Sequence, residues 1–261
     1  MKYDVYQVCS FTNKIFKGNP ACVVPLKKWL PDKTLQYIAK ENAVAETAFF
    51  IFKDNYIDLR WFTPDIEIDL CGHATLATAF VIKSVLKYPN EEILMKTMSG
   101  DLRVSNLDNM YYLNFPSRPA ISSSLPKEIK DSLNIQPVEV LKSRDYLLIY
   151  ENEKQIKDII INRQEFDKIN LGFGGVIVSS KSNYVDFVSR FFTPQASILE
   201  DPVTGSSHCT LVPYWSKVLN KNKMAAKQLS SRGGDLFCEF NNNRVLIGGQ
   251  AVLYSKGVFF I

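Results

Sequence analysis

Short segments in which hydrophobic and polar residues alternate recur along the chain, and this two-residue period predicts β-strands. In the first half the predicted strands cover residues 3–9, 21–25, 46–52, 56–62, 92–97, 101–105 and 110–115. In the second half they cover residues 138–142, 146–150, 175–180, 184–192, 235–240, 244–247 and 251–254. We therefore expect a chain that is rich in sheet.

Two segments are instead apolar on nearly every side at helical spacing, residues 73–86 and 208–219. A helix without a polar face belongs in the interior of a structure, so each is predicted to be the centre of its half. Pro213 lies inside the second helix and predicts a kink or a later start. The other predicted helices cover residues 31–42, 126–133, 153–159 and 163–169.

The sequence that leads into each apolar helix is repeated. Phe-Thr-Pro occurs at residues 62–64 and again at 192–194, and acids, a glycine turn and the helix follow both times. Each copy holds one of the two histidines of the chain, His73 and His208. The copies can be aligned by their glycines, residues 71–72 with 204–205, or by their histidines. The sequence leaves both registers open.

The repeat predicts an α+β protein of two pseudo-symmetric domains, each with an antiparallel-rich sheet wrapped around a central apolar helix. We place the first domain at residues 1–116 and the second at 117–249, and the last strand, at about 250–261, returns to the first domain. Residues 116–124 are rich in Pro and Ser and are predicted to be the linker.

Composition narrows the class of protein. Of 261 residues 22% are charged and 46% hydrophobic, and the net charge of +4 comes from scattered Lys and Arg, unlike a nucleic-acid-binding surface. No segment approaches the roughly 18 uninterrupted apolar residues of a membrane span, and the first residues lack the apolar run of a signal peptide. Five widely spaced cysteines suit reduced thiols. We expect a soluble cytoplasmic protein without nucleic-acid or membrane partners.

Glu46 is the acid best suited to proton transfer. It lies in residues 43–52, a run without any other charge. A carboxylate held in apolar surroundings loses hydration and becomes a usable proton carrier near neutral pH. The alternative is an acid at the start of a strand that is solvated or paired with Arg60.

His73 and His208 each open a predicted helix. Free N–H groups and a partial positive charge at a helix N-terminus bind carboxylate or phosphate, and they lower the pKa of an imidazole. Two such termini predict a site for a small anion, although each histidine could simply cap its helix. The neighbouring Gly72 makes His73 the stronger candidate.

Two turn residues are further candidates. Asp201 lies before Pro202 in a rigid turn that precedes the second apolar helix, so it could orient or exchange a proton, or be a plain turn residue. Asn19, between Gly18 and Pro20, is more simply a turn former.

Cys71, His73, His208 and Cys209 have the residue types of a zinc site, but their spacing is not that of structural zinc sites, and we predict no metal. A pair of thiols that catalyses racemisation is a better interpretation of these residues than a zinc site. It needs a second thiol opposite Cys71, and the glycine register places Thr204 there. Cys209 could serve only if the two turns are staggered.

Several motifs occur in the order of a known family. They are Gly18-Asn19-Pro20-Ala21-Cys22-Val23-Val24, Glu46-Thr47-Ala48-Phe49, Cys71-Gly72-His73-Ala74-Thr75, Asp201-Pro202-Val203-Thr204-Gly205-Ser206, Arg232-Gly233-Gly234 and Gly248-Gly249-Gln250-Ala251-Val252. With them the chain resembles, essentially from end to end, the PhzF family of phenazine-biosynthesis-like isomerases. The resemblance implies the diaminopimelate epimerase-like fold with the site in the cleft between two domains. It also implies a cofactor-free enzyme that is commonly a homodimer.

Members of this family with known chemistry isomerise trans-2,3-dihydro-3-hydroxyanthranilate by moving a proton along a conjugated system. The resemblance implies that Glu46 is the acid/base and that His73 and Asp201 assist it. The residues implied to bind substrate are Asn19, Gly72, Gly205 and Ser206. One departure is Ala45, where many members have Ser, and it could change how Glu46 is held.

We therefore predict a cofactor-independent isomerase that moves a proton on a small carboxylate-bearing substrate. Two other functions stay open. One is a thiol-based amino-acid epimerase or racemase that uses Cys71 and Cys209. The other is an inactive member of the family that binds a metabolite or a protein.

Overall fold

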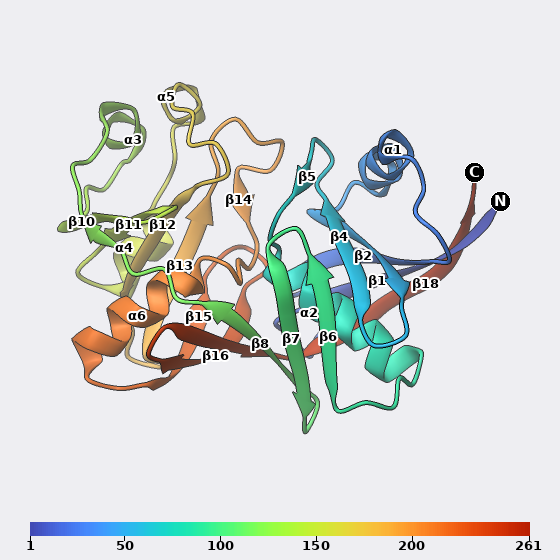
Figure 1. The fold of residues 1–261 in the computed structure, drawn as a ribbon. Helices are drawn as coiled ribbons and strands as arrows, with labels where there is room; N and C mark the ends of the chain where they lie inside the picture. The colour runs from blue at the N-terminus through green and yellow to red at the C-terminus, as the bar shows by residue number, and fades with distance from the viewer. The chain divides into compact units, whose positions relative to one another are not determined.

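The chain divides into two compact units. The computed structural model describes every residue from Met1 to Ile261. The first unit consists of Met1–Phe115 and Ile247–Ile261, and the second of Pro116–Leu246. In Figure 1 the last strand of the chain, in red, runs beside the first, in blue, because the two are paired within the first unit.

In the first unit the strands form a mixed sheet in the order β18-β1-β2-β3-β4-β6-β7-β8, with the short β5 on β4. The pairs β2–β3 and β4–β6 are parallel, and the others are antiparallel. The strand bounds are β1 Lys2–Ser10, β2 Asn19–Leu26, β3 Glu46–Phe52, β4 Ile57–Phe62, β5 Glu67–Ile68, β6 Glu92–Thr97, β7 Gly100–Leu107, β8 Met110–Pro116 and β18 Ala251–Phe260.

The helices of the first unit provide the crossovers that parallel strands require. Helix α1 (Asp32–Asn42) connects β2 to β3 and buries its apolar side, including Leu35 and Ile38, against Phe49. Helix α2 (Gly72–Phe80) connects β4 to β6, and eight of its nine residues are buried, as its apolar sequence predicts. The predicted helix does not continue unchanged to residue 86, because a π-helical turn, η1 (Val81–Val85), follows α2.

The second unit repeats this order as β9-β10-β11-β12-β13-β15-β16, with the short β14 on β13. Here β11–β12 and β13–β15 are the parallel pairs. The strand bounds are β9 Ile121–Ser122, β10 Glu139–Lys142, β11 Tyr146–Ile149, β12 Val176–Lys181, β13 Phe187–Phe192, β14 Glu200–Asp201, β15 Lys223–Gln228 and β16 Gly234–Asn241, and β17 Arg244–Gly249 crosses the boundary between the units.

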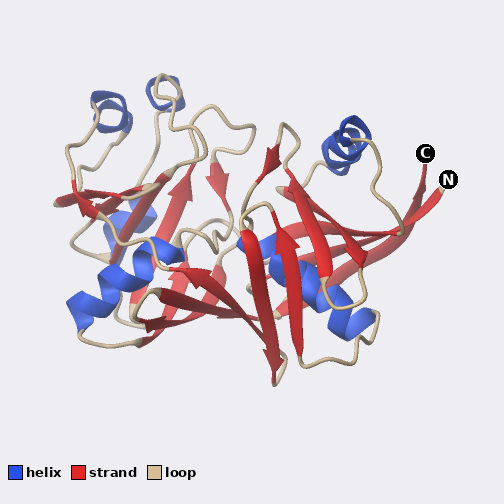
Figure 2. Cartoon of the chain, in the orientation of Figure 1, coloured by secondary structure: helices blue, strands red, loops and turns tan.

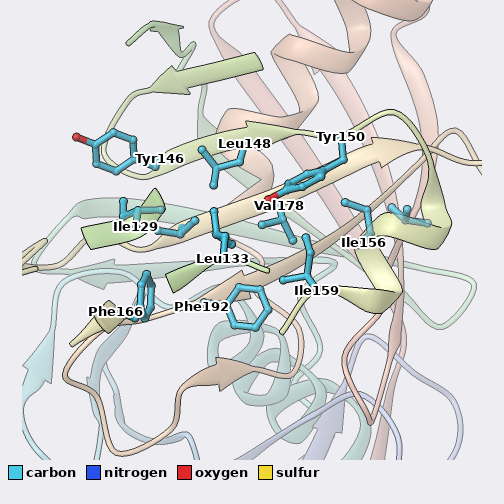
Figure 3. Close-up of a cluster of buried hydrophobic side chains, with 12 residues drawn as sticks. Ile129, Leu133, Tyr146, Leu148, Tyr150, Ile156, Ile159, Phe166, Val178 and Phe192 are labelled. Atoms are coloured by element: carbon cyan, nitrogen blue, oxygen red, sulfur yellow. The ribbon is translucent and has the colours of Figure 1, made fainter. Parts of the chain in front are cut away.

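Three short helices cover one face of the second sheet, α3 (Lys127–Ser132), α4 (Glu153–Asp158) and α5 (Arg163–Phe166). Figure 3 shows their buried side chains, Ile129, Ile156 and Phe166, in one cluster with Leu148 and Val178 of the strands. Burial of such side chains is the main term that holds the layers together.

Helix α6 (His208–Leu219) begins where the sequence predicts and runs through Pro213. Of the two expectations for Pro213, a kink or a later start, the later start is therefore wrong. Proline has no N–H to donate to the carbonyl four residues earlier, which is that of Cys209. The backbone N–H of Arg118 donates to this carbonyl instead, at 2.9 Å, so the group stays satisfied and the helix continues.

The predicted α+β class is confirmed, and Figure 2 shows few helices among many strands. The sheets are mixed rather than purely antiparallel, because each unit contains two crossover connections. Strand β15 was not predicted. None of the helices combines the length and the apolar character needed to cross a membrane.

The two units also decide the register of the repeat. Phe62 pairs with Glu67 as Phe192 pairs with Glu200, and each glutamate binds the arginine two residues before its phenylalanine at 2.7 Å. In the same register, the carbonyl of residue 71 accepts from the side chain of residue 75, and that of residue 204 from the side chain of residue 208. The glycine alignment is therefore the structural one.

It follows that Cys71 corresponds to Thr204 and His73 to Ser206, whereas His208 has no histidine counterpart. In the first unit Thr47 of β3 pairs with Phe62, and Glu46 directly precedes Thr47. In the second unit Val176 of β12 pairs with Phe192, and Gly175 directly precedes Val176. The two units thus share a backbone plan and the pairs Arg60–Glu67 and Arg190–Glu200, but the contact between Glu46 and His73 has no counterpart in the second unit.

Candidate active site

Glu46, which is partly buried, and His73, which is buried, are in contact in the first unit. Glu46 is the first residue of β3, and His73 is the second residue of α2. Glu46 Oε2 lies 2.8 Å from His73 Nε2, and the two side chains are 15% and 3% exposed. The alternative partner for Glu46 is wrong, because Arg60 binds Glu67 at 2.7 Å and Asp32 at 2.9 Å.

The other side of His73 is held by the ends of β1 and β2. His73 Nδ1 lies 3.1 Å from Asn19 Nδ2 and 3.5 Å from Cys71 Sγ. The hydroxyl of Ser10 donates to the backbone carbonyl of His73 at 2.7 Å. Gly18 permits the turn that brings Asn19 here, since it has a φ of +64° and a Cβ would lie 2.1 Å from the Ser10 carbonyl oxygen.

Opposing influences act on the protonation of His73. Burial lowers its pKa, whereas negative charge on Cys71 and Glu46, with hydrogen bonds to both, raises the pKa well above its ordinary value. The predicted lowering by the helix terminus is therefore wrong, because the anionic partners dominate. Burial likewise raises the pKa of the Cys71 thiol, to about 11.

In the second unit, Asp201 belongs to a turn that is closed by side-chain hydrogen bonds. The hydroxyl of Thr204 donates to Asp201 Oδ2 at 2.5 Å. Gln228, which is fully buried, accepts from the backbone N–H of Thr204 at 2.8 Å and donates to the backbone carbonyl of Asp201 at 2.8 Å. Sequence analysis missed Gln228 because it ends β15, the strand that the pattern did not predict.

Ser206 lies beside a charged pair that the sequence also did not reveal. Arg144 Nη2 donates to Ser206 Oγ at 3.2 Å, and the same guanidinium binds both carboxylate oxygens of Asp145 at 3.1 and 2.9 Å. Asp145 is 1% exposed and also accepts from the backbone N–H of Gly175 at 2.9 Å. Adjacent residues of opposite charge are common in sequences, so the pattern carried no signal.

His208 begins α6, and its ring turns back toward the preceding loop. Its Nδ1 donates to the carbonyl of Thr204 at 2.9 Å, and the carbonyl of Gly205 accepts from the His208 backbone N–H at 3.1 Å. Burial lowers the pKa of His208 to about 4, partly offset by the bond to Thr204. The lowered pKa agrees with the prediction in direction, but burial and not the helix terminus is the cause.

The structure groups the predicted site residues by unit. Asn19, Glu46, Gly72 and His73 belong to the first unit, where the two ionisable side chains are in contact. Asp201, Gly205 and Ser206 belong to the turn before α6 in the second unit.

One cluster could offer ligand atoms to a metal ion. Atoms of Glu46, Cys71 and His73 all lie within 4.8 Å of one another. Glu46 Oε2 and His73 Nε2 lie 2.8 Å apart without the angles of a hydrogen bond, and the Cys71 thiol would have to lose its proton to bind a metal.

Comparison with known proteins identifies what the chain resembles. Residues 8–257 match the family model described as phenazine biosynthesis-like protein. An uncharacterized isomerase of Pseudomonas aeruginosa is 41% identical over 100% of both chains. The crystal structure of a PhzF family protein from Enterococcus faecalis is 43% identical, covers 100% of both chains and gives a TM-score of 0.95. A hydroxyproline epimerase from Agrobacterium vitis, 8% identical over 98% of this chain and 92% of its own, shares the fold with a TM-score of 0.63.

Proposed function

Because this chain belongs to the phenazine biosynthesis-like (PhzF) family, we propose that it is a cofactor-independent isomerase that moves a proton on a small carboxylate-bearing substrate. The observation that carries the proposal is the contact of 2.8 Å between Glu46 and His73. A carboxylate in an apolar strand, oriented by an imidazole, has the features of a proton carrier.

The geometry favours one oxygen of Glu46 for the chemistry. Oε2 is buried and faces His73, whereas the side chain as a whole retains 15% exposure. In the proposed reaction Oε1 accepts a proton as a C–H bond of the substrate breaks. The electron pair moves along the conjugated system, and the same proton then forms a C–H bond at another carbon. No oxidant or reductant is needed.

We assign substrate binding to the two glycine turns. Backbone N–H groups at the start of α2, next to Gly72, suit a carboxylate. In the second unit Gly205 and Ser206 have the same place before α6, and the Arg144 guanidinium beside Ser206 adds positive charge. Asp201 is proposed to orient a polar group of the substrate.

The test is isotope exchange in heavy water. Wild type and Glu46→Gln are incubated with trans-2,3-dihydro-3-hydroxyanthranilate and a panel of small cyclic unsaturated acids, and deuterium in substrate and product is measured by mass spectrometry. Glu41→Gln, an exposed acid of the same unit, is the matched control. We expect Glu46→Gln to lose isomerisation and wash-in together and the control to retain both. Unchanged exchange in Glu46→Gln would refute the assignment.

The thiol-based alternative gains no support from the structure. The counterpart of Cys71 is Thr204, and Cys209 is fully buried with a thiol pKa that burial raises to about 11. The double variant Cys71→Ser/Cys209→Ser should therefore keep most of the activity, whereas a two-thiol epimerase would lose it. Binding of these acids without turnover by wild type would instead indicate a binding protein.

We also propose that the chain forms a homodimer in a reducing, cytoplasmic environment. All five cysteines are free thiols. Strand β18 pairs with β1 and carries exposed Tyr254, Val258 and Phe260, and an apolar edge strand is commonly covered by another chain. Light scattering should give twice the mass of the chain, and Val258→Lys should lower it to that of a monomer.

A further inference from the structure

The second unit has no side chain at the position that corresponds to Glu46. Gly175 is the counterpart of Glu46 in the register of the repeat. A Cβ on Gly175 would lie 2.4 Å from the ring of Phe191 and 2.8 Å from the carbonyl oxygen of Phe192, so a larger residue does not fit there. The second unit therefore brings no acid from this position to the turn before α6.

The guanidinium of Arg144 lies beside that turn instead. It donates to Ser206 Oγ at 3.2 Å and to the two carboxylate oxygens of Asp145 at 3.1 and 2.9 Å. Asp145 is almost completely buried and also accepts from the backbone N–H of Gly175 at 2.9 Å, so its carboxylate is fixed. A two-point contact with a fixed carboxylate sets the plane of the guanidinium. The Arg144 side chain stays 24% exposed, which leaves it accessible to a ligand.

Arg118 brings a second positive charge to the start of α6. Its backbone N–H donates to the carbonyl of Cys209, the second residue of the helix, at 2.9 Å. Burial raises the pKa of the Cys209 thiol, and the positive charges of Arg118 and Arg144 both oppose this rise. Arg118 Nη1 is buried and has no hydrogen-bond partner in the chain. A buried guanidinium N–H without an acceptor is rare in proteins, and an anion supplies such an acceptor.

The turn itself holds further donors. Ser206 Oγ accepts from Arg144, and its own hydroxyl proton has no acceptor in the chain. The backbone N–H groups of Gly205, Ser206 and Ser207, which directly precede α6, have no acceptor in the chain either. Such N–H groups at a helix N-terminus bind carboxylate or phosphate.

We propose that Arg144 and Arg118 form, with the N–H groups of this turn, the subsite that binds the carboxylate of the substrate, and that Asp145 positions Arg144. The start of α2 is less suited to the carboxylate, because Glu46, the proposed base, brings a negative charge there. Only the identity of the anion, as the carboxylate of the substrate, rests on the proposed function. The affinity of the subsite for a small carboxylate is a property of the folded second unit.

Binding of a simple carboxylate tests the subsite without turnover. Benzoate and its neutral analogue benzamide are titrated into the full chain labelled with ¹⁵N, and the backbone signals of Gly205, Ser206 and Ser207 are followed by NMR. Benzoate should shift these signals and benzamide should not. Arg144→Gln and Arg118→Gln should each raise the Kd of benzoate by about 10- to 100-fold, the usual cost of removing a hydrogen bond to a charged group.

Arg163→Gln is the matched control. Arg163 belongs to the same unit and also binds an aspartate, Asp167, at 3.0 Å, but it is exposed. The control loses the same charge and should bind benzoate as wild type does. Arg144→Lys keeps the charge without the two-point contact, so its affinity should lie between those of wild type and Arg144→Gln. The proposal is overturned if benzoate leaves the turn signals of wild type unshifted, if either glutamine variant of Arg144 or Arg118 binds benzoate as tightly as wild type, or if the control is weakened equally.

Asp145→Asn distinguishes positioning from simple neutralisation. Asparagine keeps an oxygen for the Gly175 N–H but removes the negative charge that the guanidinium contacts. If Asp145 only neutralised Arg144, its loss would strengthen benzoate binding. A positioning role predicts a Kd raised several-fold, with no further rise when Asp145→Asn is added to Arg144→Gln. Tighter binding by Asp145→Asn would overturn its positioning role. The emission of the buried Trp215 verifies that the second unit of each variant is folded.

Kinetics separate this inference from the proposed function. The carboxylate is held equally before and during proton transfer, so Arg144→Gln should raise KM with little change in kcat, whereas Glu46→Gln lowers kcat. If Glu46→Gln keeps its activity while Arg144→Gln loses benzoate binding, the proposed function fails and the subsite stands. If Glu46→Gln is inactive while Arg144→Gln binds benzoate as wild type does, the subsite fails and the proposed function stands.

Discussion

His208 is expected to make the second unit sensitive to acid. The imidazole is fully buried, and burial lowers its pKa to about 4 from an ordinary value of 6.5. A histidine with a depressed pKa stays neutral in the folded state, whereas the unfolded chain binds a proton as the pH falls below 6.5. Its contribution to stability is therefore complete above pH 6.5 and is lost as the pH falls toward 4.

The magnitude follows from the two pKa values. At 1.36 kcal/mol per pKa unit, the difference between 6.5 and about 4 corresponds to about 3 kcal/mol of unfolding free energy. About 2 kcal/mol of this is already lost at pH 5. Because the side chain is fully buried, solvent screening does not reduce these figures.

The perturbation that isolates this effect is His208→Gln, which replaces the imidazole by a neutral side chain that does not titrate. Urea unfolding of both proteins at pH 7, 6, 5 and 4, followed by the fluorescence of the buried Trp215, gives the stability difference at each pH. All other ionisable groups are common to both chains and cancel. The advantage of wild type should shrink by about 3 kcal/mol between pH 7 and pH 4. A difference that is constant across this range would refute the reasoning.

Three further changes test other contacts by urea unfolding. Gly175→Ala should destabilise by about 1–3 kcal/mol through overpacking, because a Cβ there would lie 2.4 Å from the ring of Phe191; an unchanged midpoint would contradict this. Gln228→Leu should destabilise by about 1–3 kcal/mol and raise KM, because the buried backbone N–H of Thr204 loses its acceptor; the expectation fails if neither changes. Pro213→Ala should stabilise by less than the roughly 3 kcal/mol typical of removing a helix proline, because the carbonyl four residues earlier already has a donor; a full gain would contradict this.

The local pattern of hydrophobic and polar residues was sufficient to predict much of the secondary structure. Strands β3 and β6 begin and end at the predicted residues, and α6 begins at the predicted His208. Strand β15 escaped prediction because its sequence, Lys-Met-Ala-Ala-Lys-Gln, contains few residues that favour strands. It is a strand because β13 and β16 supply hydrogen bonds on its two sides, and such support is a tertiary effect.

The register of the repeat was likewise not decided by local sequence but by tertiary structure. Both alignments of the two glycine turns were compatible with the sequence, since glycine and histidine each recur. The paired steps at Glu67 and Glu200 select one of them, because a ladder pairs each residue with a single partner across the sheet. That choice makes Thr204, and not a cysteine, the counterpart of Cys71.

The sequence by itself determined that Glu46 is the unusual acid, because a lone charge in an apolar strand is visible in the local pattern. It also determined the two central helices and the paired turns, since helical period and glycine are local signals. Only the tertiary structure decided that Glu46 faces His73, that Asn19 holds the opposite nitrogen of this ring, and that Gln228 closes the second turn. Distances and burial between residues far apart in the chain depend on packing, and the protonation of His73 depends on both.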